Sequence, residues 1–215
     1  MNHLIFLSVT CMPADTLLLV FVKHPVPGQV KTRLAATLGH EKALMIYQDL
    51  LAFTCDIVLR AGYETHIYYG NEIPAGDLWA RADLPRFLQS GADLGARMQQ
   101  AFSAGFEAGY RRIIVIGSDC PYLSPEGLRA GFEALDQAAA VIGPALDGGY
   151  YLLGMKTWIP EVFQAKKWST DTVLQDTLAD LDRLGHTYAL LPELGDIDEA
   201  GDLAGTFLAH YLDQA

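Results

Sequence analysis

Short apolar runs alternate along this chain with longer stretches in which apolar residues recur at helical spacing. The runs are rich in β-branched and aromatic residues and are too short for core helices, so each predicts a buried strand. The predicted strands are residues 17–22, 64–69, 86–89, 113–116, 138–142, 150–155 and 188–191. Strands that alternate with helices usually form a parallel sheet, so the pattern predicts an α/β three-layer sandwich: a mainly parallel central sheet with helices on both faces.

Amphipathic stretches and capping residues predict the helices. Asp93 is a residue type that caps helices, and Ser124 followed by Pro125 is a typical helix start. The predicted helices are residues 41–60 ending at Gly62, residues 94–108, a helix that starts at Ser124-Pro125, a helix from Thr170 or Asp171 to Gly185, and residues 199–212.

The chain shows no internal repeat, low-complexity tract or linker, so its 215 residues predict one domain. Residues 1–15 exceed what the fold needs, and we expect them to be an extension or the result of a misassigned start. No stretch approaches the roughly eighteen apolar residues of a membrane span. The apolar residues 4–9 have no Lys or Arg before them, which makes them a poor match to a signal peptide.

The composition is globular and acidic, with 51% apolar residues and a net charge of −11. A surface of this charge disfavours nucleic acid and anionic membranes as partners. The cysteines, Cys11, Cys55 and Cys120, form no C-x-x-C pair, so the sequence predicts neither a zinc site nor a disulfide framework. A reducing cytoplasm suits this pattern, and Cys120 is expected to be a buried structural thiol.

Residues 23–34, K-H-P-V-P-G-Q-V-K-T-R-L, carry three cations directly after the first predicted strand: Lys23, Lys31 and Arg33. The prolines and the glycine predict a shaped loop at the carboxyl end of that strand, which is where ligands bind in open α/β sheets. Three cations there predict a phosphate site. The alternative is an exposed basic loop that pairs with surface carboxylates. Because neither a full Walker A pattern nor G-x-G-x-x-G is present, a P-loop ATPase and a Rossmann dehydrogenase are disfavoured.

Three acidic segments also follow predicted strands. They contain Asp119, Asp147, and the pair Asp196 and Asp198. A parallel sheet brings the carboxyl ends of its strands to one edge, so these carboxylates are expected to meet the basic loop there, with Mg²⁺ between them and phosphate. Mn²⁺ has the same preference for oxygen ligands. Each segment has a structural alternative: turn chemistry for Asp119, a tight turn for Asp147, and a helix cap for Asp196 or Asp198.

Taken together, these segments resemble the DUF2064 family of the nucleotide-diphospho-sugar transferase superfamily, which has the GT-A fold. The motifs that carry the resemblance are K-x-P-x-P-G-x-x-K-T-R-L (23–34), Q-x-G-x-D-L-G-x-R-M (89–98), G-S-D-x-P (117–121), G-P-A-x-D-G-G-Y-Y-L (143–152), W-S-T (168–170) and D-I-D-x-x-x-D-L (196–203). They span nearly the whole chain in the family's order. One departure is Glu199-Ala200, where close relatives often have threonine-proline.

The resemblance implies a role for each matching position. The residues it assigns to the nucleotide are Lys23, Pro27, Gly28, Lys31, Thr32 and Arg33 for the phosphates, with Gln89, Gly91 and Asp93 near the base. It assigns the metal, Mg²⁺ or Mn²⁺, to Asp119 and Asp198. The residues it assigns to an acceptor or sugar pocket are Gly148, Gly149, Tyr150, Trp168, Ser169 and Thr170.

Two transfer reactions suit these residues. In nucleotidyl transfer the donor is a nucleoside triphosphate, and Lys31 and Arg33 would stabilise charge on the phosphoryl oxygens and the departing pyrophosphate. In glycosyl transfer the donor is a nucleotide-sugar, and inversion would need a base such as Asp147 near the hydroxyl of a small-molecule acceptor. A catalytically silent nucleotide-binding or scaffold protein on the same fold is the alternative from another class.

Overall fold

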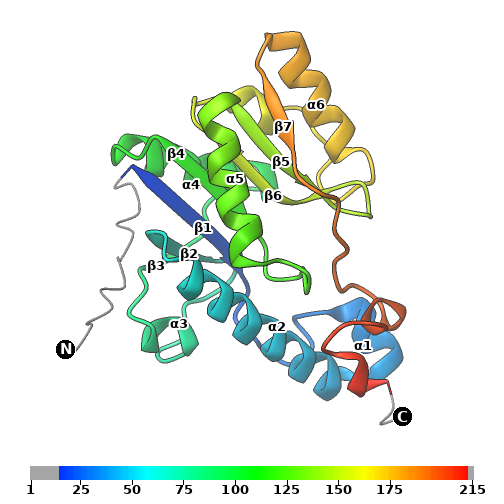
Figure 1. Ribbon diagram of the computed structural model, residues 1–215. Helices are drawn as coiled ribbons and strands as arrows, with labels where there is room; N and C mark the ends of the chain where they lie inside the picture. The colour runs from blue at the N-terminus through cyan, green and yellow to red at the C-terminus, as the bar shows by residue number, and fades with distance from the viewer. Residues whose placement is uncertain (1–14, 213–215) are drawn as a thin grey trace, which may run out of the picture.

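The computed structural model in Figure 1 describes residues 15–212. Cys11 and residues 1–14 of the expected extension lie outside this described part. Among the described residues, no helix is long and apolar enough to cross a membrane.

Seven strands form one sheet in the order β3-β2-β1-β4-β6-β5-β7. They are β1 (Thr16–Val22), β2 (Thr65–Tyr69), β3 (Arg86–Leu88), β4 (Arg112–Ile116), β5 (Ala140–Pro144), β6 (Tyr150–Met155) and β7 (Tyr188–Leu190). Only β6 among these strands runs antiparallel to its neighbours, β4 and β5. A short turn joins β5 to β6, which permits an antiparallel pair, whereas a parallel pair needs a long crossover. The predicted α/β fold with a mainly parallel sheet is confirmed.

Helices cover both faces of the sheet. One face packs against α2 (His40–Ala61), α3 (Leu78–Arg81) and α5 (Pro125–Gln137), and the other against α4 (Leu94–Glu107) and α6 (Val173–Leu184). Alternate residues of β1 serve the two layers: Leu18 and Val20 face α2, while Leu17 and Leu19 face α4. All four are fully buried, as expected for a central strand covered on both sides.

A third, smaller core joins the segment that follows β1 to the last described residues of the chain. Helix α1 (Thr32–Leu38) and the start of α2 pack there against two 3-10 turns, η2 (Ala200–Leu203) and η3 (Ala209–Tyr211). Figure 1 shows this group below the sheet, reached by the long segment that follows β7. The packing matters for the site because it fixes α1, which begins directly after Lys31.

Three predictions about local structure are wrong. Residues 199–212 form the turns η2 and η3 instead of one helix, and Gly205, with φ 75°, lies between the two turns. Helix α6 has Thr172 as its N-cap rather than Thr170 or Asp171, with no side-chain cap bond. The basic loop ends earlier than predicted, because Thr32 and Arg33 already belong to α1.

We predict that Gly154→Ala destabilises the protein by about 1–3 kcal/mol, the usual range for overpacking a core. Gly154 lies in the middle of β6, and a Cβ there would come within 2.7 Å of Ile114 Cγ1 and Val141 Cγ1. Urea denaturation would measure the free energy of unfolding. Gly76→Ala is the matched control, since nothing lies within 4 Å of its Cβ position. Equal losses in the two variants would contradict close packing of β6 against β4 and β5.

Candidate functional site

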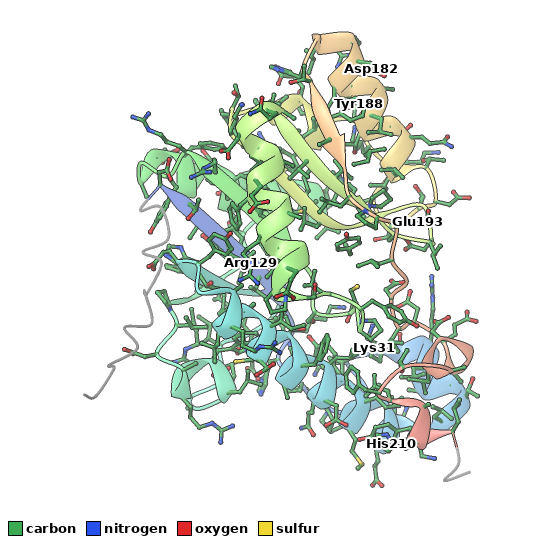
Figure 2. All side chains as sticks on the ribbon, in the orientation of Figure 1. Lys31, Arg129, Asp182, Tyr188, Glu193 and His210 are labelled. Carbon is green, nitrogen blue, oxygen red and sulfur yellow. The ribbon has the colours of Figure 1, made fainter. Side chains whose placement is uncertain are left out.

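The candidate site lies at the edge of the sheet where the parallel strands end. The connections that follow β1, β4, β5 and β7 leave the sheet at this edge, and the antiparallel strand β6 begins there. Figure 2 shows Lys31 beside α1, below the loops that leave the sheet. The topology therefore brings the basic segment and the three acidic segments of the sequence to one place.

Lys31 lies at the centre of this arrangement. Its Nζ is 2.8 Å from Asp119 Oδ1 and 3.7 Å from Asp198 Oδ1, and it donates a hydrogen bond to the carbonyl oxygen of Ile197. The 2.8 Å contact lacks the geometry of a hydrogen bond, so we treat it as an ion pair. Only 6% of the Lys31 side chain is exposed. An ammonium buried to this degree needs close anionic partners, because desolvating an unpaired charge is costly.

Arg33 and Lys23 lie at the rim of the site. Arg33 Nη1 is 3.3 Å from Asp198 Oδ2, but the Arg33 side chain is 71% exposed, so water weakens this pair. Lys23 is exposed at the end of β1. Its backbone N–H donates to the Tyr47 hydroxyl at 2.8 Å, and that hydroxyl donates to the Lys23 carbonyl oxygen at 3.2 Å. Burial raises the pKa of Tyr47, so a neutral hydroxyl fixes the start of the basic loop.

The other predicted phosphate-loop residues shape the chain between Lys23 and Lys31. Pro27 and Gly28 are exposed, and Gly28 has φ 76°, a left-handed conformation that glycine adopts at little cost. Lys31 itself has φ 46° and is the N-cap of α1, with Thr32 as the first helical residue. The Ala35 N–H donates to the Lys31 carbonyl oxygen at 2.8 Å. The backbone of Lys31 is therefore held by α1 while its side chain points into the acidic group.

Backbone hydrogen bonds hold the acidic segments in register. The Ile197 N–H donates to the Asp119 carbonyl oxygen at 2.9 Å, which ties the segment after β7 to the segment after β4. The Leu146 N–H donates to the Leu194 carbonyl oxygen at 3.1 Å, which ties the segment after β5 to the segment after β7. These bonds explain how residues so far apart in the sequence come within reach of one ammonium group.

Asp196 belongs to this site, as its position after a predicted strand led us to expect, although the family resemblance assigned the metal to Asp119 and Asp198 and gave Asp196 no role. Burial raises its pKa to about 6, helped by the negative charges of Asp147, Asp198 and Asp119 and opposed by Lys31. Carboxylates from all three acidic segments therefore lie close enough to interact electrostatically. The signal in the sequence for this role was the D-I-D spacing, which places Asp196 two residues before Asp198. Ile197, which lies between them, is fully buried.

Asp147 and Cys120 show the structural roles that the sequence allowed for them. Asp147 Oδ1 accepts a hydrogen bond from the Gly149 N–H at 2.8 Å, and Gly148 has φ 85°, so this segment is a tight turn. Asp147 is nevertheless exposed and close enough to influence the pKa of Asp196.

Burial raises the pKa of the Cys120 thiol to about 11, so the thiol stays protonated at neutral pH and is a poor nucleophile.

Gln89, Gly91 and Asp93 organise the turn between β3 and α4. The Gln89 side-chain amide donates to the Tyr68 carbonyl oxygen at 2.9 Å, and Asp93 Oδ1 accepts from the Ala96 N–H at 2.8 Å as the N-cap of α4. Gly91 has φ 140°, and a Cβ there would meet the α4 backbone at 2.7 Å. These contacts give all three residues a structural role, and a role in nucleotide binding stays a prediction.

The residues predicted for the acceptor pocket link α4, α6 and the Asp147 turn. A Cβ at Gly148 would overlap the carbonyl of Asp171, and one at Gly95 would overlap the Trp168 indole. Thr170 Oγ1 donates to the Lys167 carbonyl oxygen at 2.7 Å. Four residues of this group lie outside the helices and strands: Gly148, Gly149, Ser169 and Thr170.

Tyr150 differs from the rest of this group. It packs with the core residues on the α4 and α6 side of the sheet, its hydroxyl is buried, and burial raises its pKa. Its side chain therefore contributes to the core behind the turn, and the role in an acceptor pocket that the resemblance implies stays a prediction.

The residues suit a metal ion that is shared with a ligand. Among residues 15–212, no group of three His, Cys, Asp or Glu side chains could hold a metal ion by itself. Carboxylates of Asp119 and Asp198 and the carbonyl of Ile197 nevertheless converge on one cation, the Lys31 ammonium. Protein sites for Mg²⁺ often supply one or two carboxylates and leave the other positions to phosphate and water.

We predict that Asp196→Asn stabilises the metal-free protein by about 1 kcal/mol near neutral pH and not near pH 4. The pKa of Asp196 is raised on folding, so its protonated form contributes stability at low pH, and this contribution is lost as the pH rises through about 6. The figure is reduced because water screens a half-buried group. Urea denaturation in EDTA would measure it, with exposed Asp182→Asn as the control. The same gain at both pH values would show that Asp196 has an ordinary pKa.

Comparisons with known proteins identify the family and the fold. The sequence family described as "Uncharacterized protein conserved in bacteria (DUF2064)" matches residues 54–170, just over half of the chain. A crystal structure from Desulfovibrio desulfuricans G20, provisionally named a nucleotide-diphospho-sugar transferase, is 30% identical with a TM-score of 0.83; the match covers 93% of this chain and 94% of that one. No curated protein matches the sequence.

Two more distant structures share the fold. A nucleotidyl transferase from Methanothermobacter thermautotroptrophicus is 18% identical with a TM-score of 0.62, and the match covers 94% of this chain and all of that one. The manganese complex of Rv0371C from Mycobacterium tuberculosis H37Rv is 14% identical with a TM-score of 0.53, over 94% of this chain and 100% of that one. The chain therefore belongs to the DUF2064 family and has the fold of the nucleotide-diphospho-sugar transferases.

Proposed function

We propose that this protein is a transferase that depends on Mg²⁺ or Mn²⁺ and moves a nucleotidyl or glycosyl group from a nucleotide-activated donor to a small-molecule acceptor. The observation that carries the proposal is the convergence of Asp119 and Asp198 on one cation position beside the basic loop. The names of the structures with this fold, a nucleotide-diphospho-sugar transferase and a nucleotidyl transferase among them, support the same class of reaction.

The basic residues would bind the phosphates of the donor. Lys23 and Arg33 are exposed, whereas the Lys31 side chain is the buried cation of the three. Arg33 can present several N–H donors to phosphate oxygens, whereas a lysine acts as a mobile point charge. Positive charge at these positions is worth most when negative charge develops on the phosphoryl oxygens and the leaving group.

Asp119 and Asp198 would hold the metal. When bound, a divalent cation supplies Lewis-acid stabilisation of the phosphate oxygens and of the leaving group. The manganese complex of Rv0371C supports the view that this fold accommodates such an ion. The exposed Asp147, whose charge influences Asp196, is the candidate base for an acceptor hydroxyl in an inverting glycosyl transfer.

The transferred group can be identified with a panel of nucleoside triphosphates and nucleotide-sugars, each tested by thermal shift with and without Mg²⁺. A ligand that binds only the native state raises the unfolding midpoint. A shift with one triphosphate would favour nucleotidyl transfer, and a shift with one nucleotide-sugar would favour glycosyl transfer. Binding without turnover of any acceptor would favour a silent nucleotide-binding protein. No shift at millimolar concentrations would contradict the proposal.

We predict that Asp119→Asn weakens Mg²⁺-dependent binding of the active nucleotide by at least about tenfold, since losing a charged contact costs on the order of 1.5–3 kcal/mol. Isothermal titration calorimetry would measure the affinity. Asp182→Asn is the matched control, because Asp182 lies on α6 far from Lys31 (Figure 2). An unchanged affinity in Asp119→Asn, with a folded protein, would remove Asp119 from the site.

A further inference from the structure

We propose that the Lys31 ammonium occupies the metal position in the ligand-free protein, so that a divalent cation enters only together with the phosphates of the nucleotide. This inference rests on the proposed function for the identity of the ligand. It concerns a property that no motif of the sequence specifies: the order in which metal and nucleotide bind.

The first argument is the burial of the ammonium. The Lys31 side chain is 6% exposed and the Arg33 side chain is 71% exposed, although both basic groups lie within 4 Å of an Asp198 carboxylate oxygen. Arg33 therefore interacts from the solvent, whereas Lys31 fills the space between the carboxylates. A buried ammonium stays charged and in place only while these oxygens compensate for its lost hydration.

The second argument is the chemistry of the oxygens. Lys31 Nζ contacts carboxylate oxygens of Asp119 and Asp198 and the carbonyl oxygen of Ile197. These are the hard oxygen ligands that Mg²⁺ and Mn²⁺ prefer. A free metal ion that approached the same oxygens would meet a positive charge already in contact with them, and two like charges at such distances repel strongly where water is excluded.

The third argument is that the ammonium can move while the fold stays fixed. The Lys31 backbone is held as the N-cap of α1, where its carbonyl oxygen accepts from the Ala35 N–H. Four rotatable bonds separate that backbone from the ammonium, so the charge can leave the carboxylates without unfolding α1. A nucleotide phosphate beside the site offers a new anionic partner, and the vacated oxygens can then bind the metal that the phosphates bring.

A rival arrangement has to be distinguished. The Asp119 oxygen that faces Lys31 is buried, but the Asp119 side chain as a whole is 47% exposed. A metal ion could bind the outer carboxylate oxygens and leave Lys31 where it is. In that case removal of the ammonium would leave the affinity for free metal nearly unchanged, whereas our proposal requires that affinity to rise.

The test is a titration of the ligand-free protein with Mn²⁺ alone, followed by electron paramagnetic resonance of the unbound ion. Wild type is expected to bind Mn²⁺ weakly. Lys31→Met is expected to bind it at least about tenfold more tightly, because a competing unit charge is gone. Arg33→Met removes the same charge from the exposed rim, so its change is expected to stay below about threefold. Lys31→Gln is a second neutral variant, expected to behave as Lys31→Met does.

An unchanged or weaker Mn²⁺ affinity in folded Lys31→Met or Lys31→Gln would overturn the proposal. It would also be overturned by wild type that binds Mn²⁺ as tightly alone as with a non-hydrolysable nucleotide. The comparison on wild type needs no variant, so it can overturn the proposal even if neither variant folds. The titration with Mn²⁺ alone needs no nucleotide. If the protein failed to bind any nucleotide, the proposed function would be contradicted, but the effect of Lys31 on Mn²⁺ affinity could still be measured.

Discussion

The ion pairs of the buried Lys31 ammonium with Asp119 and Asp198 are the interaction on which the rest of the site depends. They join the loop after β1 to the segment after the neighbouring strand β4 and to the segment after the edge strand β7. The small core of α1, α2, η2 and η3 supports them by fixing both the start of α1 and the segment around Ile197. An exposed lysine–aspartate pair contributes little to a structure, but breaking a buried pair leaves an uncompensated charge in the interior.

Most of the fold could be predicted from the sequence because its signals are local. The β-branched run that became β4, the cap at Asp93 and the Ser124-Pro125 start of α5 each specify their own element. The wrong prediction of a helix over residues 199–212 has a physical cause. This segment carries apolar residues at helical spacing, such as Leu208 and Tyr211, but they are buried by 3-10 turns against α1 and α2. Tertiary packing selected that conformation over the helix that the spacing favours.

The site could be predicted only in part. The positions of charged residues after strands predicted which segments meet, since that follows from parallel topology. The burial of Lys31 and the raised pKa of Asp196 depend on which atoms surround each group, and spacing along the chain does not contain this information. The nucleotide contact that the resemblance implies for Gln89 and Asp93 stays a prediction; in the structure Gln89 donates to the Tyr68 carbonyl oxygen on β2, and Asp93 caps α4.

The central claim is that Asp119 and Asp198 bind one divalent cation together with the phosphates of a nucleotide. The most direct measurement is a crystal structure of the protein with Mn²⁺ and a non-hydrolysable donor, with the metal located by its anomalous scattering. We expect one strong peak coordinated by both carboxylates and a phosphate oxygen, with the Lys31 ammonium moved onto phosphate. A bound nucleotide with the metal elsewhere, or with Lys31 still between the two carboxylates, would contradict it.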